Sequence, residues 1–293
     1  MFFPYGDTPN PQGFKPWMTR LLIFLNFAVF FLVTVPLSRQ AQLGDGADVA
    51  ELLEYLRQRF PGRTLQSLLE GLTRYDVFTF VHGYKAGDPS FLDLMASLFM
   101  HGSVWHLLGN MLFLWIYGDN VEHRLGRVGF LLTYLVTGVV ATLTFGLFAS
   151  DSMTPMIGAS GAISGILGVY FVLFGANRIK VFVFLFPFLV TRWYVPARVV
   201  LSFYLVIDNL LPFVVGVDSG VAYGAHIGGF VGGLVIGLVA SRINTEALKR
   251  KLFPAKRVVI REVPRTGRPD PRSIVIDAEY VDDDQDQGFT KRP

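Results

Sequence analysis

The sequence of 293 residues contains no cysteine, and only 17% of its residues are charged. The absence of cysteine excludes a disulfide framework, a thiolate metal site and a cysteine nucleophile. Soluble domains carry about 25% charged residues, whereas 52% of this chain is hydrophobic. The composition therefore predicts an all-α, polytopic membrane protein whose main surroundings are the lipid bilayer. The net charge of +3 comes from clusters near span ends, so we expect no nucleic-acid partner.

Six apolar segments approach or exceed the length of about 20 residues that a helix needs to cross a bilayer. They cover residues 17–37, 101–118, 128–149, 156–176, 196–215 and 223–240. The first is longer than a signal-peptide core of about 7–15 residues and has no cleavage pattern after it, so we expect it to be retained. Residues 181–190 are apolar but interrupted by Pro187, and they are too short to cross. The sequence therefore predicts a six-span helical bundle over residues 17–241.

Two long segments lie outside the predicted spans. In residues 39–100, the stretches 51–59 and 64–72 place apolar residues at helical spacing beside charged ones. We expect a large loop with two short amphipathic helices, lying on the membrane face or over the bundle. Residues 242–293 combine basic clusters, prolines and an acidic run, so we expect this tail to be largely disordered.

The basic residues at short connections predict the orientation in the membrane. With six spans, the connections on one side contain Lys15, Arg20, Arg124, Arg127, Arg178, Lys180, Arg242, Lys249, Arg250 and Lys251. The opposite turns, 151–154 and 216–220, contain aspartate but no lysine or arginine. The positive-inside rule then places residues 1–16 and the tail in the cytoplasm and the loop 39–100 on the other side. We expect a cell-membrane protein, in the inner membrane if the source is a Gram-negative bacterium.

Two reactive side chains lie inside the apolar segments. Ser160 belongs to the glycine-rich stretch 156–168, and the sole histidine downstream of it is His226, in the small-residue stretch 223–233. Polar groups inside a span are costly and normally face a protein interior or a water-filled cavity. A serine and a histidine within hydrogen-bond reach form an activated nucleophile. The glycines around both residues also fit helix packing alone, as small-xxx-small patterns usually do.

His106 and Asn110 are four residues apart and share one face of the second predicted span. Both side chains can donate hydrogen bonds to an oxygen that gains charge during acyl transfer, as in an oxyanion hole. The other interpretation is that these groups pin a loop to the bundle, and for His101 this second interpretation is the better one. With the predicted orientation, all these polar groups lie near the non-cytoplasmic ends of their helices.

Together these residues resemble the rhomboid family of intramembrane serine proteases. The resemblance rests on Gly158, Ser160 and Gly161, on Ala225 to Gly229 with Gly233, on His101, His106 and Asn110, and on Glu122 with Arg124. It implies a serine endopeptidase without cofactor or metal that cleaves transmembrane proteins in or near their spans. Ser160 would be the nucleophile and His226 its general base. His106, Asn110 and the Ser160 backbone N–H would form the oxyanion hole, with His101, Gly158, Gly161 and Gly229 in supporting positions.

Several alternatives stay open from the sequence. Ser164 stands where the family often has an aromatic residue, and it is a minor competitor for the nucleophile. Asp208 is a candidate third member beside the Ser–His pair, although an aspartate facing an aqueous cavity or pairing with Asn209 is the better interpretation. The chain also fits a catalytically silent relative that binds or escorts membrane clients. A transporter is disfavoured because the polar groups gather at one face. The oligomeric state is not indicated.

Overall fold

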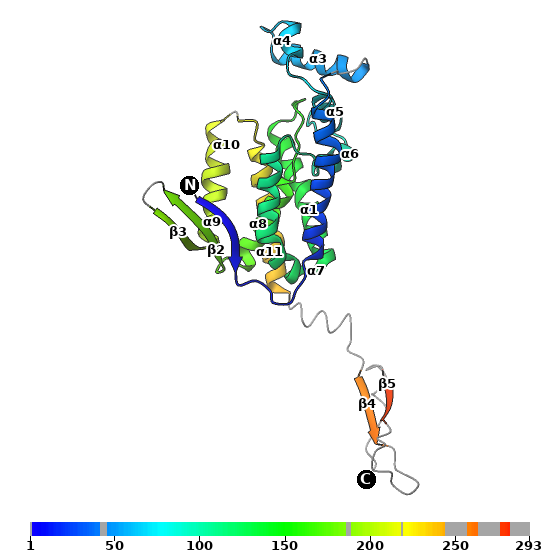
Figure 1. Ribbon diagram of the computed structural model, residues 1–293, viewed down its shortest axis with the longest axis vertical. Helices are drawn as coiled ribbons and strands as arrows, with labels where there is room; N and C mark the ends of the chain where they lie inside the picture. Colours follow the sequence, from blue (N-terminus) through cyan, green and yellow to red (C-terminus); the bar gives the residue numbers. More distant parts are fainter. Residues whose placement is uncertain are drawn as a thin grey trace. The chain divides into compact units, whose positions relative to one another are not determined.

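The computed structural model describes residues 2–41, 46–185, 189–217, 219–243, 257–262 and 276–281. The chain divides into two compact units, Met1–Arg242 and Ile243–Pro293, which are described separately. The first unit is a bundle of helices with a small sheet beside it (Figure 1).

Apolar helices dominate the first unit. They are α1 (Trp17–Val29), continued by η1 (Phe30–Thr34) and α2 (Val35–Ser38); α7 (Val104–Phe148); α8 (Ser160–Leu173); α9 (Ala197–Leu205), continued by η2 (Val206–Leu210) and α10 (Leu211–Val215); and α11 (Tyr223–Arg242). Within the described residues, four helices are long and apolar enough to cross a membrane, namely Trp17–Ser38, Val104–Phe148, Ala197–Val215 and Tyr223–Arg242, whereas α8 has 14 residues. The predicted polytopic helical membrane protein is confirmed, and the count of six spans stays a prediction.

The second and third predicted spans are the two halves of α7. The helix continues through residues 119–125 and breaks at Gly126, whose φ of 74° and ψ of 166° lie outside the helical region. Glycine adopts this positive φ without a steric penalty. Asn110 from the first half and Thr142 from the second line the same cavity, so the chain doubles back at Gly126.

Two charged residues just before this turn attach it to neighbouring helices. The buried Glu122 carboxylate accepts hydrogen bonds from the backbone N–H groups of Met18 and Thr19, at 3.0 and 2.8 Å, in the first turn of α1. A carboxylate there satisfies unpaired N–H groups and complements the helix dipole. Arg124 donates to the carbonyl of Ala240 near the end of α11, at 2.8 Å. The motif of Glu122 and Arg124 therefore ties α1 and α11 to the turn in the middle of α7, which lies at one end of the bundle.

A three-stranded antiparallel sheet lies at the same end of the bundle, in the order β1 (Phe2–Thr8), β2 (Arg178–Leu185) and β3 (Leu189–Pro196). Thr8 pairs with Arg178, which pairs in turn with Pro196. The sequence-based expectation has no strand here. The signal was present, because Ile179, Val181 and Val183 alternate with other residues and are buried, which is the period of a half-buried strand.

The described residues between α2 and α7 form four short helices: α3 (Ala47–Arg59), α4 (Leu65–Leu69), α5 (Arg74–His82) and α6 (Phe91–Ser97). The predicted helical stretch 51–59 lies in α3, whereas 64–72 contains only the five-residue α4. The Tyr55 hydroxyl of α3 lies 2.8 Å from that of Thr154, just before α8. This contact places α3 over the end of the bundle where α8 begins.

In the second unit the structure describes two paired strands, β4 (Arg257–Glu262) and β5 (Ile276–Val281), which run antiparallel. The rest of the tail that we expected to be disordered, residues 244–256, 263–275 and 282–293, lies outside the described residues.

Asp7 of β1 is buried against α7 and α8. Its Oδ2 accepts hydrogen bonds from the Tyr170 hydroxyl and, at 2.8 Å, from the Asn120 amide. Its Oδ1 has no hydrogen-bond partner among the described residues. Burial, assisted by the neighbouring Asp119 carboxyl, raises the pKa of Asp7 to about 6, because a low-dielectric site disfavours the charged form.

This raised pKa predicts a pH-dependent stability. An acid whose folded-state pKa exceeds its unfolded value stabilises the fold fully below about pH 4, and this contribution is lost as pH rises through about 6. Relative to the native protein, Asp7→Asn should therefore gain stability between pH 4 and 7, by on the order of 2 kcal/mol. Thermal unfolding of both proteins in detergent across this range measures the difference, and a difference that does not vary with pH would contradict the assignment.

Candidate active site

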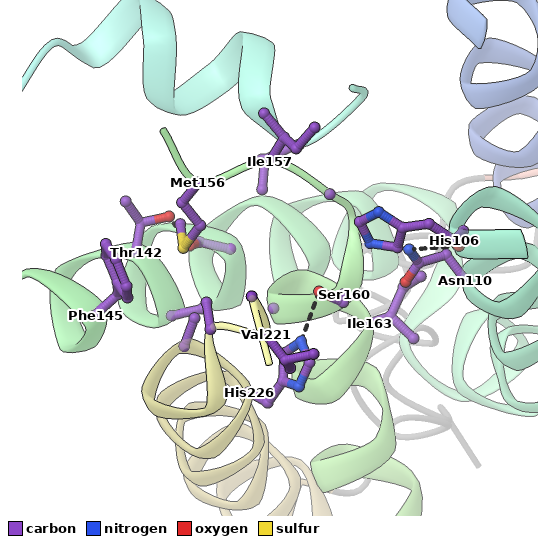
Figure 2. Close-up of a pocket in the computed structure, with 18 of the residues that line it drawn as sticks. His106, Asn110, Thr142, Phe145, Met156, Ile157, Ser160, Ile163, Val221 and His226 are labelled. Carbon is purple, nitrogen blue, oxygen red and sulfur yellow. Dashed lines mark hydrogen bonds between the residues drawn. The ribbon is translucent and has the colours of Figure 1, made fainter. Parts of the chain in front are cut away.

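The polar residues singled out from the sequence meet at the beginnings of three helices. Ser160 is the first residue of α8, His226 the fourth of α11 and His106 the third of α7. Ser160 Oγ lies 2.7 Å from His226 Nε2, and a dashed line marks this hydrogen bond in Figure 2. A hydroxyl and an imidazole from two separate helices are thus within hydrogen-bond distance.

This distance depends on the close contact between α8 and α11. A Cβ added to Gly229 would lie 2.1 Å from the carbonyl oxygen of Gly161, and one added to Gly233 would lie 1.9 Å from that of Gly165. Backbone atoms cannot move aside as a flexible side chain can, so only glycine fits at both positions. The packing interpretation of these glycines and the chemical one therefore apply together, because the same contact brings the serine to the histidine.

Gly158 brings the connection before α8 against His106. Its φ is +122°, and a Cβ there would lie 2.8 Å from both Cε1 and Nε2 of the His106 ring. Both the backbone conformation and the missing space require glycine. The His106 ring therefore lies beside the backbone that leads into Ser160 (Figure 2).

His106 and Asn110 line the same cavity as Ser160. The Asn110 amide donates to the carbonyl of His106 at 3.0 Å and keeps a second N–H. Because Ser160 begins α8, its own N–H is one of the first four of the helix, which have no acceptor within the helix. The structure thus places the residues predicted as an oxyanion hole around one cavity, and their role stays a prediction.

His101 is expected to pin a loop to the bundle, and in the structure its backbone makes that contact. Its carbonyl accepts a hydrogen bond from the Tyr75 hydroxyl of α5 at 3.0 Å. Neither nitrogen of its buried ring has a hydrogen-bond partner among the described residues, and the ring centroid lies 5.0 Å from that of His106. His101 therefore joins the loop to the bundle through its backbone, while its ring packs beside His106.

The two open alternatives, Ser164 and Asp208, lie away from the Ser–His pair. Ser164 is fully buried, and its hydroxyl contacts the carbonyl of Ser160 at 2.8 Å and the Tyr204 hydroxyl at 2.6 Å. Asp208 is exposed. The second ring nitrogen of His226, Nδ1, instead lies 2.7 Å from Oδ1 of Asn209. From the sequence, Asn209 enters only as a neighbour of Asp208, and its signal is a polar amide within an apolar span.

The Ser–His pair opens onto a cavity of about 850 Å³. Its walls come from both halves of α7, the connection before α8, the beginnings of α8 and α11, and Arg59 of α3, and they include His106, Asn110, Thr142, Phe145, Met156, Ile157, Ser160, Val221 and His226 (Figure 2). Within the described part of the chain, no group of three or more histidine, aspartate or glutamate residues is arranged to hold a metal ion. The cavity is large enough for several residues of an extended peptide.

Comparison with known proteins identifies the family. The model of the Rhomboid domain matches residues 88–243, just over half of the chain. The chain therefore belongs to the rhomboid family, and it is a multi-pass membrane protein.

Individual relatives match part of the chain. RHOMBOID-like protein 6, mitochondrial, from Arabidopsis thaliana is 28% identical over 174 residues, covering 56% of this chain and 52% of that protein. Rhomboid protein 1, mitochondrial, from Saccharomyces cerevisiae is 35% identical over 100 residues, 33% of this chain and 29% of that protein. Putative rhomboid protease YdcA from Bacillus subtilis is 31% identical over 93 residues, 31% of this chain and 46% of that protein. The chain thus spans about half or less of the length of these relatives.

The contact between α8 and α11 gives a prediction about stability. Gly229→Ala places a methyl group against the Gly161 carbonyl and should lower the free energy of unfolding by about 1–3 kcal/mol. The matched control is Gly146→Ala on α7, where the nearest atom to the added Cβ is the Tyr84 hydroxyl oxygen at 3.6 Å, an ordinary contact. Thermal unfolding in detergent measures both variants, and equal stability of the two would show that α8 and α11 are not in tight contact.

Proposed function

We propose that this protein is an intramembrane serine endopeptidase that cleaves transmembrane proteins in or near their spans. The observation that supports this most is the distance of 2.7 Å between Ser160 Oγ and His226 Nε2 at the wall of a cavity of about 850 Å³. Membership of the rhomboid family and the match to a relative named as a putative rhomboid protease add to it.

The proposed reaction begins with attack of Ser160 on a substrate carbonyl. His226 Nε2 takes the hydroxyl proton as general base and then gives it to the leaving amine. The carbonyl oxygen becomes negatively charged in the tetrahedral intermediate, and the donors at Asn110, His106 and the Ser160 N–H stabilise it. Because Ser160 begins α8, the positive end of the helix dipole also points at this charge. A water molecule then hydrolyses the acyl-enzyme by the same steps.

The substrate enters the cavity as an extended chain. A transmembrane helix uses its carbonyl groups in its own hydrogen bonds, so it must unwind locally before a carbonyl can approach Ser160. We propose further that the protein lies in a cell membrane with both termini in the cytoplasm, which puts the cavity toward the opposite side. The other end of the bundle holds Arg124 together with Arg178 and Lys180 of the sheet. Basic residues favour the cytoplasmic side, which supports this orientation.

The nucleophile and base are tested by Ser160→Ala and His226→Ala. Each should abolish cleavage of a tagged single-span reporter whose apolar helix contains a glycine–proline break, because the first change removes the attacking hydroxyl and the second removes the base that activates it. Cleavage is followed by the size of the tagged fragments in proteoliposomes, and thermal unfolding verifies that the variants fold. Persistent cleavage by folded Ser160→Ala would refute the assignment.

The second candidate function is a catalytically silent member of the family that binds membrane clients. The intact Ser160–His226 pair argues against it. A fluorophosphonate, which reacts with activated serines, distinguishes the two functions. We expect mass spectrometry to locate the adduct on Ser160 and not on Ser164, and an unlabelled native protein would favour the binding function.

The oxyanion hole is tested by Asn110→Ala. Removal of one donor of this kind costs about 10²–10³ in kcat in a soluble protease, and we expect a similar loss here with little change in KM. The control is Asn10→Ala, because Asn10 donates to Asp119 at 2.9 Å, outside the cavity. An Asn110→Ala variant with native kcat would remove Asn110 from the oxyanion hole.

A further inference from the structure

The imidazole of His226 has a hydrogen-bond partner on each of its two nitrogens, and the proposed function uses only one of them. Nε2 faces Ser160 Oγ, while Nδ1 faces Asn209 Oδ1, both at 2.7 Å. Asn209 lies in the π-helical turn η2 and is only 1% exposed. A buried amide in an apolar span is costly unless it is hydrogen-bonded, so its contacts call for an explanation.

The orientation of the Asn209 amide follows from a backbone carbonyl. The Asn209 Nδ2 group lies 2.8 Å from the carbonyl oxygen of Tyr204, which can only accept a hydrogen bond. The amide nitrogen must therefore face Tyr204, and the amide oxygen must face His226. Because that oxygen has no proton to donate, His226 Nδ1 must carry the proton in this contact. A neutral imidazole with its proton on Nδ1 has a lone pair on Nε2, directed at the Ser160 hydroxyl.

The element that carries Asn209 is attached to the same helix as the nucleophile. The Ser164 hydroxyl donates to the carbonyl of Ser160, so its contact with Tyr204 must be donated by the tyrosine hydroxyl. Tyr204 thus connects α9 to α8 one turn below Ser160 and at the same time offers its carbonyl to Asn209. In η2 the helix widens to a π-turn, a feature that is frequent at functional sites.

We infer that Asn209 is a positioning residue, which holds His226 in the Nδ1-protonated tautomer and so completes a Ser160–His226–Asn209 triad. The inference rests on the proposed function and deepens it. The amide does what an aspartate does in the soluble triad, where the acceptor fixes the tautomer and orientation of the histidine. A neutral acceptor suits a buried position, because it avoids the cost of desolvating a carboxylate. Asp208, the acidic neighbour, is exposed and takes no part.

Two substitutions at residue 209 separate positioning from packing. Asn209→Leu keeps the number and branching of the side-chain heavy atoms but removes the acceptor, and we expect fluorophosphonate labelling of Ser160 to slow about 10- to 100-fold, less than the roughly 10⁴-fold loss when a soluble triad presents the wrong tautomer. Asn209→Asp keeps an accepting oxygen toward Nδ1 in either protonation state and should restore the rate to within a few-fold of native. Asp208→Asn is the matched control and should label at the native rate.

Two results for the labelling rates of these variants would overturn the inference. Native labelling by Asn209→Leu would show that the acceptor is not needed. Equal slowing in the Leu and Asp variants, with unfolding temperatures lowered alike, would show that Asn209 only packs the helix.

Nitrogen NMR of the ¹⁵N-histidine-labelled full chain in detergent tests the same contact independently of activity, because protonated and unprotonated ring nitrogens have well-separated shifts. We expect a protonated Nδ1 and an unprotonated Nε2 for His226, assigned by their loss in His226→Ala, and a mixture of tautomers in Asn209→Leu. A native His226 protonated on Nε2 would contradict the inference. If the native protein failed to react with fluorophosphonate, the proposed function would fail while the spectrum still decided the role of Asn209.

Discussion

The backbone contact between α8 and α11 is the constraint on which the site depends. The close contact of these two helices holds the serine at the start of α8 within hydrogen-bond distance of the histidine near the start of α11. Here Gly161 and Gly165 face Gly229 and Gly233 so closely that a single added methyl group would meet a carbonyl oxygen. In a bilayer, such small-residue contacts are also a main source of helix association. The same residues therefore stabilise the bundle and position the chemistry.

A second constraint is that polar groups inside the bundle need partners. The structure satisfies several of them in connected sets: Glu122 with the first turn of α1, Tyr204 with Ser164, and Asn209 with His226. These sets also divide the bundle into two ends. One end is tied together by Glu122, Arg124 and the sheet, and the other end holds the cavity. At the first end, Arg124 attaches α11 to α7, and Tyr170 attaches α8 to Asp7 of β1. These contacts help to hold the two helices in one arrangement, in which their N-terminal ends are close together.

Much of this arrangement could be predicted from the sequence, for identifiable reasons. The apolar segments and the polar residues within them are local signals, so the sequence predicts the helical bundle and singles out Ser160, His226, His106 and Asn110, which the structure places around one cavity. The sheet was missed because β1 pairs with a strand about 170 residues away, and the short alternation in β2 was interpreted as an interfacial segment. Asn209 was passed over because an aspartate beside it looked more chemically suitable. Which of two adjacent polar residues faces the histidine depends on the π-turn in η2, which hydrophobic periodicity does not reveal.

The central claim is that Ser160 attacks a carbonyl whose oxygen enters the donor group of Asn110, His106 and the Ser160 N–H. The most direct measurement is an experimental structure of the protein after reaction with a peptidyl phosphonate, whose tetrahedral phosphorus mimics the intermediate. The account predicts continuous density from Ser160 Oγ to phosphorus, with one phosphonyl oxygen within about 3 Å of the Asn110 amide and the Ser160 N–H. An adduct on another residue, or a phosphonyl oxygen directed away from these donors, would contradict it.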